Sequence, residues 1–328
     1  MKAIIKVLSL FLIVLVSSTK TAKAGDEPLV EKSKTYSKTY TVGNSDKVSF
    51  NNQFGDIKIS TWDKNEVKVD VTLIGKGNTE QIATEILNRL SVEDGKNSSG
   101  IYFKTKIGSW GNGTKHNNTG FNINYVIYMP ATNPLSVENQ FGKTSIGDYS
   151  GEFTLNQQFG MFTAGKLGNV KKMNIEFSGG SSIGSINGGD IYIKFSRTLI
   201  SKIEGSVKAN FEHCGGVKIG IDNSLKSLTI KNSFNELYLE ASNNLSANFD
   251  IHTSFAEIDN KTSFPIKEKE EEESHGPKFD HDYVGKSGNG TTPIKIRTEF
   301  GEVKIGHNLS FDVNEKEEKK EKKKSRSV

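Results

Sequence analysis

A short phrase centred on phenylalanine recurs along the chain: Asn52-Gln53-Phe54-Gly55, Asn139-Gln140-Phe141-Gly142 and Gln157-Gln158-Phe159-Gly160. Later copies of the phrase are centred on Phe177, Phe195, Phe211, Phe234, Phe255 and Phe300. From Phe141 to Phe255 the successive steps are 18, 18, 18, 16, 23 and 21 residues, and a step of 45 residues leads to Phe300. A repeat of about 20 residues is too short for a pair of helices and suits a β-coil or a leucine-rich unit. The Leu and Asn positions of a leucine-rich unit are absent, so the spacing indicates repeated β-structure.

The residues after each phrase alternate between apolar and polar, as at Ile57 and Ile59 or at Val303 and Ile305. Such alternation is typical of short strands. One coil cannot bury its own inner face, but stacked coils pair their strands and form a continuous core. The sequence therefore predicts an all-β fold, a parallel β-solenoid (β-helix) with coils of roughly 16–23 residues. In this prediction the phenylalanines stack as an interior column, and the following glycine permits a turn that a Cβ would resist. A β-sandwich with meandering strands remains the alternative.

The first 24 residues have the features of a signal peptide. Lys2 and Lys6 precede an apolar run over 8–16, and Ala22 and Ala24 provide the small residues of a cleavage site. The apolar run is shorter than the roughly 20 residues of a spanning helix, and no second such run follows. We therefore expect a chain exported through its signal peptide to the periplasm, the outer surface or the medium, with no transmembrane segment in the mature chain.

Export also changes the charge balance. The whole chain has 43 Lys+Arg against 39 Asp+Glu, and the leader contains four lysines and no acid, so the mature chain has 39 of each. A neutral chain without a basic, aromatic stripe argues against nucleic-acid binding. Cys214 is the only cysteine, so no disulfide can form within the chain.

Composition changes along the chain suggest further boundaries. Residues 25–134 are expected to form an N-terminal β-rich capping region, with strands over 35–42, 47–51, 56–61, 66–73, 101–107 and 122–129. A helix is expected over 78–90, with Asn78 as its cap. The solenoid is expected over 135–312, with a charged loop insertion at 267–290, and a disordered charged tail over 313–328.

The sequence resembles the bacterial DUF4097-type, adhesin-like proteins, which include auto-transporter adhesin head domains. The resemblance rests on the stretch from Val48 to Asp63, on Val126 to Gly142, and on Tyr283 to Gly290 before Ile294. It implies a β-solenoid of the cell envelope. It supplies no reaction, cofactor or catalytic residue.

Polar residues offer several weak candidates for chemistry. A metal cluster could involve His275, Asp280, His281 and Asp282, although their spacing matches no established site. His213 and Cys214 are adjacent, and strand neighbours point to opposite faces, so we expect Cys214 to be a small core residue. Trp62 and Trp110 could stack on sugars but more often serve packing. Glycosidase chemistry would need two carboxylates about 5–9 Å apart, and the scattered acids are Asp56, Glu138, Asp148, Glu152, Asp190, Glu204, Asp222 and Glu240.

We therefore expect no catalytic, cofactor-binding or metal-binding residues, and no cofactor. The expected function is non-enzymatic: an adhesin-like binding or scaffolding protein of the cell envelope or surface, with an envelope protein or a glycan as its partner. The alternatives are a carbohydrate-active β-helix enzyme and an envelope-sensing accessory of a regulatory system.

Overall fold

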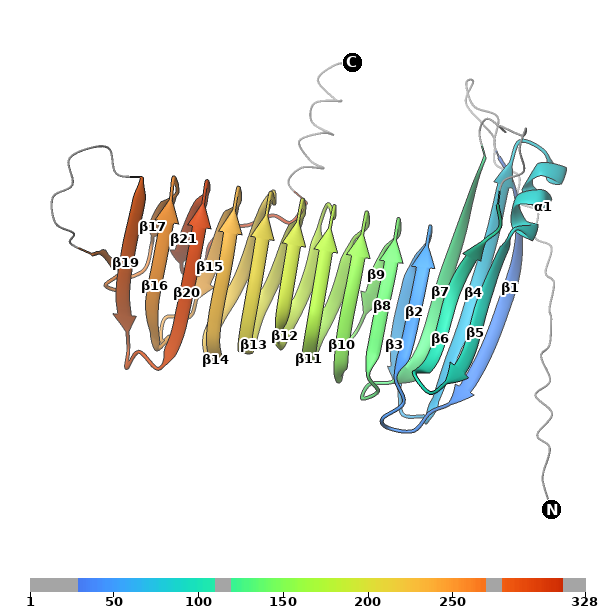
Figure 1. The fold of residues 1–328 in the computed structure, drawn as a ribbon, viewed down its shortest axis with the longest axis horizontal. Helices are drawn as coiled ribbons and strands as arrows, with labels where there is room; N and C mark the ends of the chain where they lie inside the picture. Colours follow the sequence, from blue (N-terminus) through green and yellow to red (C-terminus); the bar gives the residue numbers. More distant parts are fainter. Residues whose placement is uncertain (1–28, 110–118, 270–278, 315–328) are drawn as a thin grey trace. The chain divides into compact units, whose positions relative to one another are not determined.

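The computed structural model describes residues 29–109, 119–269 and 279–314 and shows an all-β chain with one helix in these ranges (Figure 1). The chain divides into two compact units between Lys143 and Thr144. The expected signal peptide, 1–24, lies outside the described residues, as does nearly all of the expected tail, 313–328. No helix of the described ranges is long and apolar enough to cross a membrane.

The first unit pairs its strands in two ladders. One ladder runs β1–β4–β7–β3 and the other β5–β6–β2–β8. These strands are β1 (Val30–Thr41), β2 (Val48–Gln53), β3 (Ile57–Trp62), β4 (Glu66–Gly77), β5 (Leu90–Asn97), β6 (Gly100–Ile107), β7 (Gly120–Pro130) and β8 (Leu135–Gln140). All six strands expected in this region are present, and β5 is an additional one. The pairs β1–β4, β4–β7 and β5–β6 are antiparallel, whereas β3–β7, β2–β6 and β2–β8 are parallel.

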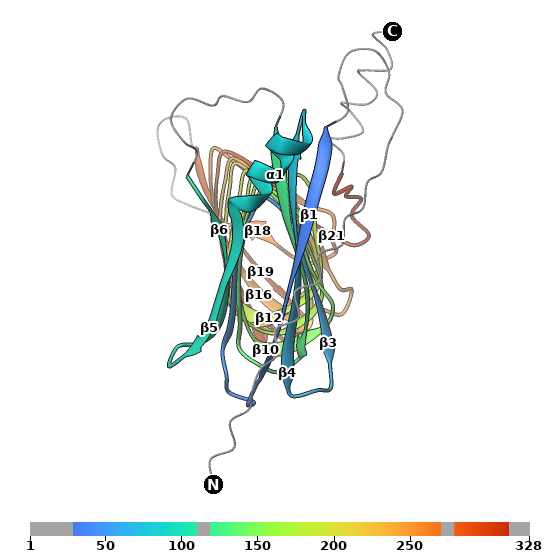
Figure 2. The same ribbon diagram turned by 90° about the vertical axis from the view of Figure 1, so that its right-hand side faces the viewer.

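Apolar side chains of the two ladders meet inside the first unit. Phe50 lies 5.5 Å from Phe103 and 6.5 Å from Tyr125 between ring centroids, and all three are buried. Helix α1 (Glu80–Asn88) lies across one end of the unit (Figure 2). Its N-cap is Thr79, not the expected Asn78, because the Thr79 hydroxyl accepts from the backbone N–H of Ile82. The helix buries Ala83, Ile86 and Leu87 and thereby closes this end of the core.

The second unit consists mainly of parallel strands that lie side by side (Figure 1). From β10 to β14 each strand pairs in parallel with the next; for example, Ile191 pairs with Ala209 and Ala209 with Ile230. The strands are β9 (Thr144–Ile146), β10 (Tyr149–Gln158), β11 (Phe162–Glu176), β12 (Ser181–Lys194), β13 (Arg197–Glu212), β14 (Gly216–Ser233), β15 (Glu236–Ala241), β16 (Ala247–Ser254), β17 (Glu257–Asn260), β18 (Lys267–Glu268), β19 (Asp280–Ser287), β20 (Thr292–Glu299) and β21 (Glu302–Gly306). The long strands contain register shifts, as between Asn187 and Gly189, where positive φ at Gly188 and Gly189 bends the chain.

The repeat that comes last in the sequence, β20 and β21, does not lie at the end of the row of strands. Strand β20 pairs in parallel with both β14 and β16, and β21 pairs in parallel with both β15 and β17. The repeat of Phe300 is therefore inserted between those of Phe234 and Phe255. The segment 267–290, expected to be a charged loop, includes β19, which pairs antiparallel with β16. Backbone pairing with β16 explains why a segment of low apolar content is a strand here.

The recurrent phenylalanines do not form the expected interior column. Phe54, Phe141, Phe159, Phe177, Phe195, Phe234, Phe255 and Phe300 all have positive φ, between 48° and 61°. Each side chain is 36–52% exposed. Strict alternation would place Phe141 on the same face as the buried Asn139, but a left-handed residue rotates the side chain outward. The core consists instead of mostly aliphatic rows, such as that of Ile175 and Ile193, which pair with each other in β11–β12 and are fully buried.

Two further expectations at these corners are wrong. Phe211 is buried, as a member of an interior column should be, but it does not lie at the corner; the exposed corner residue of its repeat is His213, with φ 51°. Gly142 and Gly301 do not have positive φ, so the turn does not depend on them. Close approach explains these glycines, because a Cβ on Gly142 would lie 1.9 Å from the Gly55 oxygen and one on Gly301 2.3 Å from the Asn235 oxygen.

The residues after β21 run back over neighbouring strands of the second unit. We call 307–314 the C-terminal strap. Leu309 donates its N–H to Glu240 (2.7 Å), and the Phe311 ring lies 4.3 Å below the Arg197 guanidinium. Arg197 is buried and donates from Nε to the Asp312 carbonyl (2.5 Å). The strap therefore ties β15 and β13 to the C-terminal end of the chain.

Candidate functional site

The exposed aromatic rings of the second unit form one stack, which we call the aromatic ladder. Neighbouring rings have centroid distances of 4.6–5.3 Å and interplanar angles of 3–18°. In spatial order the members are Phe159, Phe177, Phe195, His213, Phe234, Phe300, Phe255 and Phe279. The spacing equals that of neighbouring strands, because each strand or repeat contributes one ring.

The first unit has a shorter stack of the same kind. Phe54 stacks on Phe141 at 4.8 Å with an interplanar angle of 8°. Phe121 lies edge-on to Phe54 at 5.0 Å. The first two phrases of the sequence therefore also present their rings outward.

Backbone hydrogen bonds fix each ladder residue. The N–H of Phe159 donates to the carbonyl of Glu176, Phe177 donates to Lys194, and Phe195 donates to Glu212, each at 3.1 Å. Each acceptor directly precedes the next ring of the ladder. A left-handed conformation costs about 1–2 kcal/mol for a residue with a side chain, so these bonds and the ring stacking must offset that cost at every corner.

The small polar residue after a ring forms hydrogen bonds with backbone groups of the corners. The Ser196 hydroxyl donates to the Lys194 carbonyl (2.7 Å) and accepts from the Ser178 N–H (3.0 Å). Cys214 occupies the same position after His213, is buried, and its thiol lies 3.3 Å from the Glu212 carbonyl. This is the expected small core residue, and His213 points away from it to the surface.

A buried asparagine lies two residues before several of the rings. Asn52 donates from Nδ2 to the Gly55 carbonyl (3.1 Å) and the Ile123 carbonyl (3.0 Å). Asn232 donates to the Asn235 carbonyl (3.2 Å) and to the Thr298 hydroxyl (2.9 Å). These side chains satisfy carbonyls of the corner that the strand pairing leaves free. The sequence contained this signal, because a polar residue at an inward position needs a fixed partner.

The stacking geometry limits what the ladder can bind. Parallel rings less than 5.5 Å apart cover one another's faces, so the exposed part of each interior ring is its edge. Sugars stack on ring faces, whereas ring edges offer apolar contact and a weak positive potential. The ladder is therefore an apolar ridge that suits an extended partner lying along it.

Charged side chains flank the ladder. Lys194 and Glu212, which precede Phe195 and His213, form an ion pair of 2.7 Å. The hydrogen bond from Lys194 lowers the pKa of Glu212, and the same bond raises the pKa of Lys194. This ion pair therefore holds together two charged side chains that flank the rings of Phe195 and His213.

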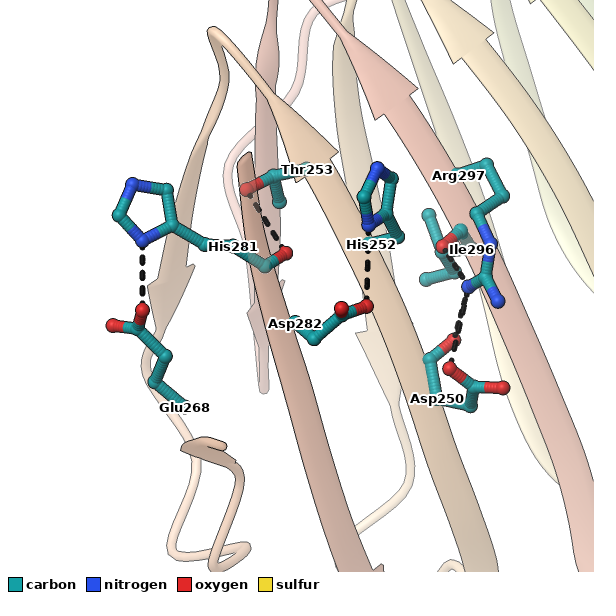
Figure 3. Close-up of polar contacts among 8 residues, drawn as sticks. All are labelled: Asp250, His252, Thr253, Glu268, His281, Asp282, Ile296 and Arg297. Atoms are coloured by element: carbon teal, nitrogen blue, oxygen red, sulfur yellow. Dashed lines mark hydrogen bonds and ion pairs between the residues drawn. The ribbon is translucent and has the colours of Figure 1, made fainter. Parts of the chain in front are cut away.

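The residues first considered for a metal site are divided between different partners. His281 Nδ1 lies 2.7 Å from Glu268 Oε1, and Asp282 lies 3.1 Å from His252 Nδ1 (Figure 3). Asp280 is exposed, and His275 lies outside the described residues. In the described ranges, no three His, Cys, Asp or Glu side chains are grouped so that they could hold a metal ion.

The scattered carboxylates are engaged by lysines or by amide donors. Glu152 pairs with Lys171, and Lys202 bridges Glu204 and Asp222. Asp56 accepts from the Lys143 N–H, Asp148 from the Lys166 N–H and Glu138 from the Asn51 amide. Glu240 binds Lys218 and the strap, and Asp190 is exposed.

The tryptophans do not form a sugar platform in the described ranges. Trp62 stacks on Tyr128 at 5.5 Å and donates from Nε1 to the Glu66 carbonyl (2.8 Å). Trp110 lies outside the described residues. Trp62 therefore has a packing role in the first unit.

Comparisons with known proteins give likenesses among solved structures only. No family model matches the chain, so the resemblance to DUF4097-type proteins is not confirmed, and no curated protein matches it. A putative adhesin from Bacteroides fragilis is similar, with 10% identity, a TM-score of 0.45 and coverage of 83% of this chain and 97% of that one. A putative cell adhesion protein from Clostridium sporogenes has 13% identity, a TM-score of 0.27 and coverage of 84% and 100%. A putative lipid binding protein from Parabacteroides distasonis has 13% identity, a TM-score of 0.32 and coverage of 83% and 96%. Function must therefore be inferred from the side chains of this chain.

Proposed function

We propose that this protein is a non-enzymatic binding or scaffolding protein of the cell envelope or surface, an adhesin-like β-solenoid that engages its partner along the aromatic ladder. The observation that supports this proposal is the exposure of the ladder. Eight stacked rings in the second unit have at least one edge in solvent, although the chain places aliphatic rows in its core. Large, contiguous apolar surface on a soluble protein is characteristic of an interaction site.

Backbone strain supports the same conclusion. Burying a phenylalanine would gain about 1.5–3 kcal/mol relative to exposure, and a left-handed residue costs energy as well. Each corner of the ladder therefore loses the burial energy of a ring and also bears the steric cost of a left-handed residue. Exposure of the rings for binding accounts for a repeat that retains both of these destabilising features. Residues in sparsely populated backbone regions cluster where structure serves binding.

Export through a signal peptide remains part of the proposal. The features of residues 1–24 support it, and an envelope location would bring the ladder into contact with envelope proteins and glycans. Edge exposure favours a protein over a glycan as partner, because interior ring faces are covered.

The test is a binding measurement on cell-envelope fractions. Mature recombinant protein and a Phe177→Ser/Phe195→Ser/Phe234→Ser/Phe255→Ser variant would be immobilised and incubated with membrane and wall fractions. We expect retention by the wild type and at least a tenfold loss in the variant, provided that both melt cooperatively. Equal retention by both proteins would refute a binding role for the ladder.

A further inference from the structure

The two halves of the aromatic ladder differ in the charges at their flanks. At the position two residues after the ring, the first half has Met161, Gly179, Arg197 and Gly215. The second half has Glu236, Glu302, Glu257 and His281 at the same position. At the sequence position just before the ring, the first half has Gln158, Glu176, Lys194 and Glu212, and the second half has Ser233, Glu299, Ser254 and Lys278. The first half therefore has two cations and two carboxylates at these positions, whereas the second half has four carboxylates, one lysine and one histidine.

The carboxylates of the second half lie in register. Glu236 is the direct partner of Glu302 in β15–β21, and Glu302 is the direct partner of Glu257 in β17–β21. Neighbouring like charges on paired strands destabilise a sheet. Lys304 offsets part of this repulsion, with its Nζ 2.7 Å from Glu302 and 3.8 Å from Glu236. Glu257 and Glu299 form no ion pair within the described residues.

The rings beside these carboxylates are as exposed as any in the ladder. Phe255 is 52% exposed and stacks on both Phe300 and Phe279. The acidic half of the ladder therefore presents an apolar ridge and, next to it, a row of carboxylates. Apolar side chains can cover the ring edges while cations pair with the carboxylates beside them.

We propose that this end of the ladder, which we call the acidic end (Phe234, Phe300, Phe255 and Phe279 with Glu236, Glu302, Glu257 and Glu299), docks an extended basic polypeptide segment that also carries apolar side chains. This inference rests on the proposed function and names its class of partner. A sugar is disfavoured because neighbouring rings cover both faces of Phe234, Phe300 and Phe255, and an anionic lipid surface is disfavoured by the carboxylates. Lysine or arginine alone would leave the ring edges uncovered, so the partner needs both kinds of side chain.

The length of such a segment follows from the ladder. Four rings span three steps of about 4.8 Å, and an extended chain advances about 3.3 Å per residue. A segment of roughly five residues therefore covers the acidic end. Binding of so short a segment is expected to be weak and to depend on ionic strength.

The test uses a fluorescein-labelled peptide of about ten residues that alternates lysine and leucine, titrated against the mature protein by fluorescence anisotropy. Peptides of equal length that alternate glutamate and leucine, or lysine and serine, are the comparison probes. We expect the lysine–leucine peptide to bind at least about tenfold more tightly than either comparison peptide. Its affinity should fall as salt is raised.

Matched double variants locate the site. Phe234→Ser/Phe255→Ser and, separately, Glu257→Gln/Glu299→Gln should each weaken binding by about tenfold or more. Phe54→Ser/Phe141→Ser removes the stacked pair of exposed rings of the first unit, which lies outside the aromatic ladder, and should change affinity by no more than about twofold. Melting temperatures of all variants show whether the fold is kept. The glutamine variants alter no ring and keep the test valid if a serine variant unfolds.

Several results would overturn the proposal. Equal losses in both ring variants, or no loss in the glutamine variants, would show that the acidic end is not the site. If the lysine–serine peptide binds as tightly as the lysine–leucine peptide, apolar side chains are not required. If the glutamate–leucine peptide does so, basic side chains are not required. Binding to phosphatidylcholine vesicles that falls equally in both ring variants would identify a lipid surface instead. If the peptide contrast fails while ring variants still lose envelope binding, the proposed function stands and only this class of partner is wrong.

Discussion

The buried aliphatic rows and the exposed aromatic ladder arise from the same repeat but follow opposite rules. Ile193 and Phe195 are two residues apart, yet Ile193 is fully buried and Phe195 is 51% exposed. Regular alternation places Ile193 inside the stack, and the positive φ of Phe195 (49°) places its ring outside. The interior thus depends on burial, whereas the ladder depends on stacking and on backbone hydrogen bonds. Apolarity alone does not show on which side of a corner a residue lies.

The largest expected effect belongs to the interior. Ile193→Ala should lower the free energy of unfolding by about 2–5 kcal/mol, because it removes buried methyl groups and leaves a cavity between neighbouring rows. Chemical denaturation monitored by circular dichroism measures the change. A loss below about 1 kcal/mol would show that the row contributes little packing.

Phe195→Ala should have a smaller effect. The variant loses stacking on Phe177 and His213 at 4.9 and 5.3 Å, each worth about 0.5–1.5 kcal/mol. The two contacts together give an expected loss of about 1–3 kcal/mol in the same denaturation experiment. An interior column predicts a loss of about 3–5 kcal/mol on removal of such a ring, so a loss clearly above about 3 kcal/mol would contradict the exposed ladder.

Phe195→Gly is the matched control for the left-handed backbone. Glycine adopts positive φ without the steric cost that alanine pays. The glycine variant should therefore be at least as stable as the alanine variant, contrary to the usual order of these residues in a strand. A glycine variant clearly less stable than the alanine variant would argue against positive φ at this corner.

The smallest expected effect concerns the C-terminal strap. Burial acts to raise the pKa of Glu240, but hydrogen bonds from Lys218 and from the backbone N–H groups of Leu309 and Asn308 outweigh it and hold the pKa below its usual range. A lowered folded pKa means that the stabilisation is present above the unfolded pKa, and that it is lost as pH falls through the folded value. Glu240→Gln should cost about 1 kcal/mol near pH 7.

The pH dependence distinguishes this charge effect from lost packing. The difference in stability between Glu240→Gln and the wild type should shrink as pH falls below the ordinary Glu pKa of about 4.3 and through the lowered pKa of the folded Glu240 carboxylate. Denaturant midpoints at neutral and acid pH measure it. A difference that does not change with pH would show that the carboxylate charge does not hold the strap.

The candidate site was visible in the sequence only as a repeat. The phrases around Phe141, Phe159 and Phe177 identified the corners, but the alternation rule assigned their rings to the core. His213 was missed as a ladder member because it is not a phenylalanine, although a step of 18 residues from Phe195 predicts it. Phe211, which is aromatic, matches the recurrent phrase better than His213 does. The buried asparagines two residues before the rings were the overlooked sign that the chain turns there.

The acidic end could not be predicted from order along the chain. Glu302 lies 45 residues after Glu257 and 66 after Glu236, and they become neighbours only because β20 and β21 insert between earlier strands. The charged segment 267–290 was read as a loop because its composition is polar. Pairing of β19 with β16 depends on backbone groups, which composition does not report.

The sequence by itself determined the class of secondary structure and the repeat length, because period-two alternation and regular spacing follow directly from strand geometry. The tertiary structure decided which way the phenylalanines point. A left-handed residue is stable at a corner only when the neighbouring repeat accepts its N–H and stacks on its ring. The tertiary structure also decided the order of the repeats, since strand insertion depends on contacts between residues distant in the chain. The exposed aromatic ladder follows from the outward direction of the rings, and its acidic end follows from the order of the repeats in space.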